Sequence, residues 1–290
     1  MSVILGATGQ VGSHVFKTLQ AIEPDAQLRI VSRHSPDDLC DGVEWREVDA
    51  SNDVDGLASA LHDAAAVFVM NPVPPDAVDV YQKAAKISDT IALAVKKAGR
   101  PRIVALSSQG AHLSQGTGII TALHDFEEAL RATDAPLTFV RSTFFMESWL
   151  PFAAAAMKSG QWWAMRDPPD EQNSAVSARD VGAVIAQCLH DEDSPGIVNV
   201  TGSRMYSEND AAALMASLSG RAIEVVPVPA AERPGAFEGA GLSPSYAAAL
   251  AEMHDALDAG RVPFEIMPDT RQGGTSLEEV LCVLMPNTPG

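Results

Sequence analysis

The chain begins with a short apolar run that leads directly into three regularly spaced glycines. Val3 to Leu5 precede Gly6, Gly9 and Gly12. An amphipathic stretch begins within this motif, with apolar residues at helical spacing, namely Val11, Val15, Phe16 and Leu19. A strand, a glycine turn and a helix in this order build a binding site for the diphosphate of a dinucleotide. Gly6 allows the tight turn, Gly9 lets the backbone approach the phosphates, and Gly12 lets the helix pack close to the strand. The alternative is a bare turn, but the position at the first strand of the chain favours the dinucleotide site.

The N-terminus of this helix presents free N–H groups and a partial positive charge to the diphosphate. We therefore predict that the cofactor contacts the whole turn, which comprises Gly6, Thr8, Gly9, Gln10, Val11 and Gly12.

Composition excludes several other classes of protein. The net charge of −18 argues against binding to nucleic acid, which requires lysine and arginine to displace counterions. Apolar runs such as 64–70 are too short to span a bilayer, and the N-terminus lacks the basic segment of a secretion signal. The cysteines Cys40, Cys188 and Cys282 fit neither a disulfide framework nor the spacing of metal ligands. We expect a cytoplasmic protein with reduced thiols, no metal site and no membrane contact.

Strand-like and helix-like stretches alternate through residues 1–150. Apolar runs predict strands at 28–32, 43–48, 65–70, 102–107 and 137–141, and helical spacing predicts helices over 76–98 and around 126–131. Gly99 is placed to end the longer helix. This alternation predicts an α/β fold with a doubly wound parallel sheet.

The second half of the chain follows a different pattern. Trp162, Trp163 and the prolines at 168–169 indicate a loop-rich region. Ser177 to Asp180 predicts the start of a helix that ends near His190, with Asp180 as a cap, and 197–200 predicts a strand that returns to the sheet. Another helix begins at 207–210 and stops at Gly220. We predict a Rossmann domain over 1–150, with 175–202 returning to it, and a smaller substrate lobe within 151–290.

The end of the second predicted strand indicates which dinucleotide binds. An acidic residue about 20 positions beyond the glycines would select NAD. Here the strand is followed by Arg33, and Asp37 and Asp38 lie further on. The planar guanidinium of Arg33 suits a 2′-phosphate, so NADP(H) is favoured over NAD(H). The alternative is that Arg33 only solvates the strand end and that both dinucleotides bind.

Two more strand ends add predicted cofactor contacts. Asp49 and Ala50 follow the third strand, where a carboxylate can accept a hydrogen bond from the adenine amino group, although Asp49 can equally cap the next helix. Asn71 and Pro72 follow the fourth strand, and ligands in such folds bind outside the carboxyl ends of the strands.

With these residues placed, the chain resembles the NmrA-like branch of the atypical short-chain dehydrogenases/reductases. The matching segments are Gly6–Gly12, Ile103–Gly110, Val140–Glu147, Ser177–Val181 and Gly273–Val280. The resemblance covers nearly the whole length and implies a Rossmann domain, a smaller C-terminal lobe and a substrate between them. The family contains NADPH-dependent quinone and dye reductases, and also regulators that bind a dinucleotide without turnover.

One feature of the wider superfamily is missing. Its Tyr-x-x-x-Lys pair protonates a carbonyl, but none of Tyr81, Tyr206 and Tyr246 has a lysine four residues later. Tyrosine-driven alcohol chemistry is therefore disfavoured. Quinone reduction demands less, because the hydride comes from the nicotinamide and the product phenolate can take a proton from water or a nearby donor.

Candidate catalytic and substrate residues follow the fifth and sixth strands. Ser107 and Ser108 end the fifth strand, with Ser107 expected against the cofactor and the Ser108 hydroxyl as a proton donor, unless both only cap the turn. His112 and His124 are alternative donors near neutral pH, although a lone histidine is more often a surface or core residue.

Aromatic residues near the end of the sixth strand are the predicted substrate contacts. Phe144, Phe145 and Met146 follow this strand, where side chains can line the nicotinamide and a flat substrate. The resemblance supports Phe145 most, which we expect against the cofactor, whereas Phe144, Met146 and Trp149 are expected against the substrate. Glu147 stands where relatives often carry asparagine. Trp162 and Trp163 are further candidates for an aromatic wall, although core packing is expected for at least two of the tryptophans.

The sequence thus predicts an NADPH-dependent oxidoreductase that passes hydride to a quinone-like or conjugated carbonyl compound. The first alternative is a dinucleotide-sensing regulator that binds protein partners, and the second is another enzyme class such as an epimerase. The expected partners are a small planar molecule and, as a homodimer, a second copy of the chain.

Overall fold

The computed structural model describes residues 1–35, 42–264 and 266–285. Cys40, Asp37 and Asp38 lie outside the described residues. In the described chain an eight-stranded parallel sheet has the order β13-β10-β6-β5-β4-β1-β2-β3. Its strands are β1 (Ser2–Leu5), β2 (Leu28–Ser32), β3 (Val43–Glu47), β4 (Ala66–Val69), β5 (Arg102–Ser108), β6 (Leu137–Ser142), β10 (Ile197–Thr201) and β13 (Arg271–Gln272). The predicted Rossmann-like α/β class is confirmed.

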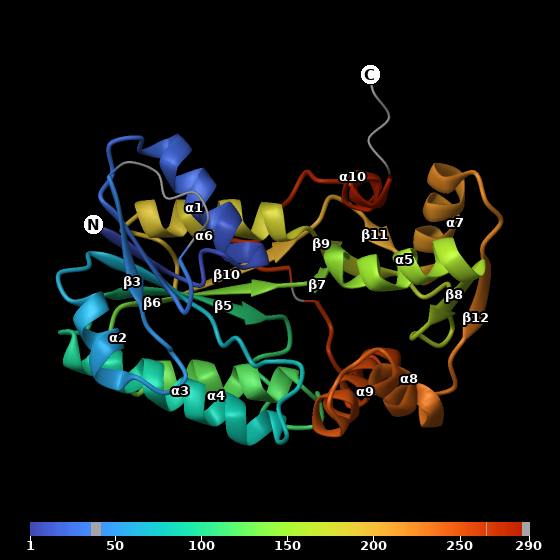
Figure 1. The fold of residues 1–290 in the computed structure, drawn as a ribbon, viewed down its shortest axis with the longest axis horizontal. Helices are drawn as coiled ribbons and strands as arrows, with labels where there is room; N and C mark the ends of the chain where they lie inside the picture. The colour runs from blue at the N-terminus through green and yellow to red at the C-terminus, as the bar shows by residue number, and fades with distance from the viewer. Residues whose placement is uncertain (36–41, 265, 286–290) are drawn as a thin grey trace.

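Helices cover both faces of this sheet (Figure 1). One face packs against α1 (Gln10–Ile22) and α6 (Ala178–His190), and the other against α2 (Val54–Leu61), α3 (Val80–Lys97) and α4 (Ile120–Arg131). The strands are apolar on both sides because side chains alternate across a strand. In β1, Ile4 belongs to the core below α1, whereas Val3 and Leu5 belong to the core on the opposite face.

A smaller group of elements extends from the carboxyl ends of the strands (Figure 1). It contains β7 (Phe144–Phe145), α5 (Leu150–Ser159), β8 (Gln161–Ala164), β9 (Asn173–Val176), β11 (Met205–Tyr206), α7 (Glu208–Ser219), β12 (Glu224–Pro227), α8 (Arg233–Gly239), α9 (Pro244–Asp258) and α10 (Leu277–Leu281), with short 3-10 turns at Met146–Trp149, Ala230–Glu232 and Cys282–Leu284. The proposed division into two domains stays a prediction.

The predicted strands in the first 150 residues are confirmed, but the long helix starts later than expected. Asp79 caps α3 by accepting a 2.9 Å hydrogen bond from the N–H of Gln82. Pro72, Pro74 and Pro75 precede it, and a proline disfavours helical geometry in the residue before it. The end is as predicted, because Gly99 adopts a left-handed φ of 89°.

Two predictions for the second half are wrong. Trp162 and Trp163 lie in β8, which pairs in parallel with the distant β12 and is not part of a loop. Ser177, not Asp180, caps α6. The Asp180 carboxylate accepts 2.9 Å hydrogen bonds from the N–H and hydroxyl of Thr275, and it therefore holds the segment after β13 against the start of α6.

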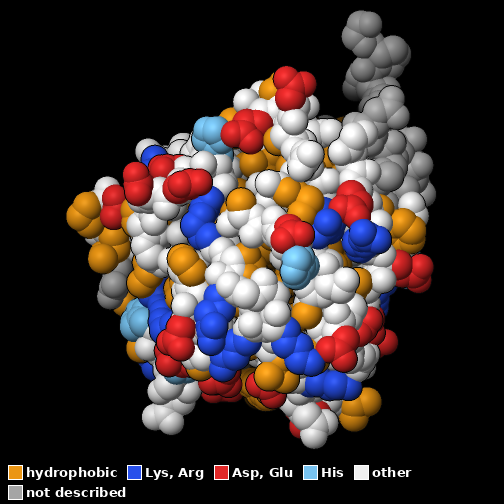
Figure 2. All heavy atoms as spheres, turned by 90° about the vertical axis from the view of Figure 1, so that its left-hand side faces the viewer, with side chains coloured by type: hydrophobic (Ala, Val, Ile, Leu, Met, Phe, Trp, Pro, Cys, Tyr) orange, Lys and Arg blue, Asp and Glu red, His pale blue; other side chains and the backbone are white. Residues whose placement is uncertain are grey.

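Charges of both signs share the end of the molecule that carries β3 and α2. Figure 2 shows lysine and arginine side chains interleaved with aspartate and glutamate on this face. Two ion pairs join these elements to their neighbours, namely Arg29 of β2 with Glu44 of β3, at 2.6 Å, and Lys97 of α3 with Asp55 of α2, at 2.7 Å. The net negative charge is therefore not gathered there as one acidic patch. None of the helices in the described chain is long and apolar enough to cross a membrane.

Candidate active site

The glycine turn has the geometry that the spacing predicts. Gly6 has a left-handed φ of 70°, and the Gly9 N–H donates a 2.9 Å hydrogen bond to the Gly6 carbonyl. A Cβ on Gly12 would lie 2.2 Å from that carbonyl oxygen, so only glycine allows α1 to pack this close. Gly9 is the N-cap of α1 and supplies no side chain to cap it. The first N–H groups of α1 are therefore free to bind an anion.

A cavity of about 430 Å³ lies beside this turn and brings together most of the predicted cofactor residues. Of these residues, Gly6, Thr8, Gly9, Arg33, Asp49, Ala50 and Pro72 line it. Gln10, Val11 and Gly12 lie in α1 and do not line this cavity. Arg33 is exposed at the cavity edge, where no carboxylate among the described residues pairs with it. Lys83 of α3 is a second cation in the lining, which the sequence reasoning missed.

Asp49 is held in a fixed orientation but does not cap a helix. Its carboxylate accepts hydrogen bonds from the Ser51 N–H at 2.9 Å, the Ser51 hydroxyl at 2.7 Å and the Asn52 amide at 2.7 Å. Burial alone would raise its pKa, but these hydrogen bonds hold the pKa of Asp49 below its usual value. Asp53 caps α2, so the capping alternative for Asp49 is wrong.

A second cavity, of about 290 Å³, lies at the carboxyl ends of β4, β5 and β6 and shares Met70 with the first. Of the predicted residues, Asn71, Ser107, Ser108, Phe144 and Phe145 line it. We call it the inner cavity.

Three buried polar atoms in the lining of the inner cavity have no hydrogen-bond partner among the described residues. They are Asn71 Oδ1, Gln109 Oε1 and Thr143 Oγ1. The Asn71 amide nitrogen donates to the Ala84 carbonyl and the Ser88 hydroxyl, both at 3.0 Å, which fixes the side chain. Buried polar groups normally find partners, so these atoms fit a polar ligand such as the nicotinamide carboxamide.

The two serines of β5 have different environments. Ser107 is buried, and its hydroxyl donates a 2.5 Å hydrogen bond to Glu127 of α4. Its proton is therefore committed to Glu127, and its predicted contact with the cofactor stays a prediction. Ser108 is half-buried, lines the inner cavity, and its hydroxyl has no partner among the described residues. Ser108 thus remains the candidate donor.

The two candidate histidines are not brought to the site. His112 is exposed and lines none of the cavities described here. A ring nitrogen of His124 lies 2.9 Å from the Ala111 carbonyl, so His124 holds the loop between β5 and α4 and also lines none of them. Their assignment as proton donors is therefore corrected.

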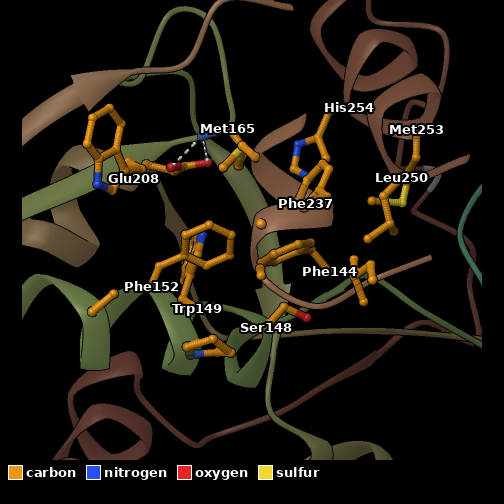
Figure 3. Close-up of a pocket in the computed structure, with 17 residues that line it drawn as sticks. Phe144, Ser148, Trp149, Phe152, Met165, Glu208, Phe237, Leu250, Met253 and His254 are labelled. Carbon is orange, nitrogen blue, oxygen red and sulfur yellow. Dashed lines mark hydrogen bonds between the residues drawn. The ribbon is translucent and has the colours of Figure 1, made fainter. Parts of the chain in front are cut away.

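A third cavity, of about 650 Å³, opens from the inner cavity and is mostly apolar (Figure 3). The two share Phe144, Ser148, Leu250 and Met253. Trp149 and Trp163 also line this outer cavity, and the Trp149 ring centroid lies 5.1 Å from that of Phe144. Met146 and Trp162 are fully buried core residues that do not line it, so the predicted substrate contact of Met146 is wrong.

Glu208 and His254, which sequence reasoning missed, place polar groups in this apolar wall. The buried Glu208 carboxylate accepts hydrogen bonds from the Trp162 indole at 3.1 Å and from the N–H groups of Met165 and Arg166. Burial raises the pKa of Glu208 to about 7, although these hydrogen bonds act in the opposite direction. His254 is 7% exposed. Its burial, together with the positive charges of Arg233 and Arg166, lowers the pKa of His254 to about 3.

Helix α9 connects the substrate side of the site with the cofactor side. Its residues Leu250, Met253 and His254 line the outer cavity. At its N-terminus, the Ser243 N–H donates to the Pro75 carbonyl at 2.9 Å and the Ser243 hydroxyl donates to the Ala77 carbonyl at 2.6 Å. The loop between β4 and α3, which lines the first cavity, is therefore tied to α9.

The fold is thus that of a Rossmann-type α/β protein, and a cavity beside its glycine turn is linked by shared lining residues to an apolar pocket. A model of the NmrA-like family matches residues 2–270, and the chain therefore belongs to the NmrA-like family. The resemblance that the sequence motifs indicate is confirmed.

The chain is also similar to a named relative over most of its length, and it shares its fold with solved structures. The chain is 28% identical over 268 residues to an NAD(P)H azoreductase of Xenophilus azovorans. The aligned region covers 88% of this chain and 86% of the relative. It shares its fold with the NADPH-dependent quinone oxidoreductase of Escherichia coli solved with NADPH, at a TM-score of 0.80, 22% identity and coverage of 98% and 99%. The Citrobacter sp. triphenylmethane reductase solved with NADP(H) gives a TM-score of 0.80 at 19% identity and coverage of 98% and 100%.

Proposed function

We propose that the protein is an NADPH-dependent reductase that transfers hydride to a flat conjugated acceptor, with quinones as the leading class. One observation carries this proposal. The first cavity beside the glycine turn, the inner cavity and the apolar outer cavity are connected through shared lining residues. Hydride transfer needs a cofactor and an acceptor in one continuous site. The names of the azoreductase and quinone oxidoreductase relatives support the same chemistry.

The residues that line the first cavity and the inner cavity fit NADPH along its whole length. The free N–H groups of α1 would bind the diphosphate, the Asp49 carboxylate would accept a hydrogen bond from the adenine amino group, and Arg33 with Lys83 would supply positive charge for the 2′-phosphate. The unpaired buried atoms of Asn71, Gln109 and Thr143 would form hydrogen bonds with the nicotinamide carboxamide. When bound, the cofactor supplies the hydride.

The protein's own groups orient the acceptor and provide its proton. Phe144, Trp149 and Trp163 offer aromatic surface to a flat ring in the outer cavity. The Ser108 hydroxyl lines the inner cavity without a partner among the described residues, and it can therefore donate to an acceptor oxygen. None of Tyr81, Tyr206 and Tyr246 lines these cavities, so a tyrosine donor is not used.

Steady-state oxidation of NADPH with a panel of quinones and azo compounds tests the proposal. We expect turnover with at least one quinone, and a kcat about tenfold to a hundredfold lower in Ser108→Ala with KM little changed. Tight NADPH binding without turnover of any acceptor would instead favour the dinucleotide-sensing regulator. The missing tyrosine–lysine pair motivates that second candidate, whereas the large apolar pocket favours the reductase.

A further inference from the structure

The outer cavity is apolar along most of its length but has a polar end. Arg166, Asn173, Glu208 and His254 line a small recess of about 10 Å³ together with Phe144, Trp149 and Leu257. Phe144, Trp149, Glu208 and His254 also line the outer cavity, so the recess continues it. Figure 3 shows Glu208 and His254 along one side, with Trp149 and Phe152 along the other.

Two side chains at this end have hydrogen-bonding capacity that the described residues do not use. Arg166 is 6% exposed, and its Nε donates to Asp258 at 2.5 Å. No described residue accepts from its two terminal nitrogens. The Nδ1 atom of His254 is buried without a partner among the described residues, and the ring is held against Phe237 at 5.6 Å between centroids. A neutral imidazole carries one N–H donor and one acceptor nitrogen.

The charges behind this end cancel. Asp258 accepts from Arg166 and, at 2.5 Å, from Arg233, while Asp255 accepts from Arg233 at 2.6 Å. Two guanidinium groups therefore face two carboxylates, and Glu208 adds a further carboxyl group. An anionic ligand would find no surplus positive charge to replace its hydration. Hydrogen-bond donors without surplus positive charge are suited instead to an uncharged oxygen atom that accepts a hydrogen bond.

We infer that Arg166 and His254 form a recognition subsite for an uncharged oxygen acceptor, such as an ether or keto oxygen, at the far end of a multi-ring substrate. This inference rests on the proposed function, because it names the substrate that the outer cavity takes. A site with buried polar groups rejects an analogue that leaves them unpaired. The subsite therefore discriminates between substrates of equal size and shape.

Binding to the complex with NADP⁺, which holds no hydride, tests the inference by titration calorimetry. The probes are three naphthoquinones that carry methoxy, ethyl or sulfonate on the ring remote from the quinone. We expect the methoxy compound to bind about five- to tenfold more tightly than the ethyl compound, the gain from one hydrogen bond. The sulfonate compound should bind most weakly.

The variant His254→Phe keeps a ring of similar shape but removes the hydrogen bond. We expect it to weaken binding of the methoxy compound to the level of the ethyl compound, whose affinity stays unchanged. His62→Phe is the matched control, because His62 is an exposed histidine paired with Asp63, and it should keep the full preference. Arg166→Lys, which keeps the charge opposite Asp258 but loses the terminal nitrogens, provides a second test if His254→Phe does not fold.

An equal methoxy preference in the wild type and in both folded variants would overturn the inference, as would tightest binding of the sulfonate. The proposed function is judged separately. If the protein binds the probes with the expected preference but oxidises no NADPH, the proposed reductase function is refuted and the inferred subsite stands. An active reductase without the preference would refute the subsite alone.

Discussion

Ser107 and Glu127 are joined by a buried 2.5 Å hydrogen bond between the end of β5 and helix α4. Glu127 also accepts from Arg141 Nε at 2.8 Å and from Arg131 at 2.7 Å, and it is completely buried. One carboxylate thus ties the strand that carries Ser108 to the helix and strand that follow it. The wall of the inner cavity depends on this contact.

Removing the Glu127 charge should therefore destabilise the protein strongly. Glu127→Gln leaves Arg141 without a full counter-charge, and breaking such a buried pair costs about 3–5 kcal/mol. Although burial favours the protonated form, the hydrogen bonds from Arg141 and Ser107 hold the pKa of Glu127 below its usual value. Its contribution to stability is thus present above the unfolded pKa and is lost as the pH falls through the folded one. Urea denaturation from pH 7 downward measures both effects, with the exposed Glu128→Gln as the control.

Gly12→Ala tests the packing of α1 against the turn. The new Cβ would lie 2.2 Å from the Gly6 carbonyl oxygen, so the helix must shift away from the turn. We expect a loss of about 1–3 kcal/mol in the free energy of unfolding and at least about a tenfold rise in the Kd for NADPH. Gly196→Ala, where the nearest atom would be 3.9 Å away, should change neither quantity. Unchanged NADPH affinity in Gly12→Ala would contradict the assignment of the diphosphate to this turn.

Arg33 should set the preference for NADPH over NADH. Arg33→Ala removes a charged donor from the cavity edge, and a charge-assisted hydrogen bond corresponds to about a ten- to hundredfold change in Kd. The Kd for NADPH should rise by that factor while the Kd for NADH stays nearly constant. Fluorescence titration of both coenzymes measures the ratio. Arg221→Ala, whose guanidinium donates to the Met157 carbonyl far from the cavity, is the control. An equal effect on both coenzymes would show that Arg33 only solvates the strand end.

Glu208 should make stability fall as the pH rises. Burial raises its pKa from 4.5 to about 7, so the folded protein holds the proton more tightly than the unfolded chain. The contribution is fully present below pH 4.5 and is lost as the pH rises through about 7, with a maximum of about 3 kcal/mol. In Glu208→Gln this part of the pH dependence should vanish, whereas the exposed Glu224→Gln should retain it. Parallel stability profiles for Glu208→Gln and the wild type between these pH values would count against the assignment.

Local sequence signals were sufficient where one segment determines its own structure. The apolar runs of β1, β4 and β5 are diagnostic because both faces of a parallel strand are buried. The glycine turn was also predictable, because the residues that determine its conformation lie within a few positions of one another. The helix start predicted at 207–210 is likewise local, because Ser207 forms a capping box with Asp210.

Contacts between distant segments carry no such local signal. Trp162 and Trp163 join a strand only because Val225 and Val226 of β12 pair with them. Met146 and Phe144 are two residues apart, yet one enters the core and the other the cavity. Glu208 belongs to a motif that is typical of the start of a helix, so the sequence did not indicate its contact with the outer cavity. His254 shares helical spacing with Leu250 and Leu257, and a polar residue on that otherwise apolar face was the sequence signal for it.

The hydrogen bonds of Ser243 have a consequence for how new specificities can arise on this scaffold. Because α9 both anchors the proline-containing loop beside the first cavity and presents Leu250 and His254 to the outer cavity, a substitution that displaces this helix changes the cofactor side and the substrate side of the site together. Variation of acceptor preference is therefore best tolerated at side chains that leave the helix axis in place. Side chains of α5 and α8 line the outer cavity without holding that loop, so substrate preference can change most readily at these positions.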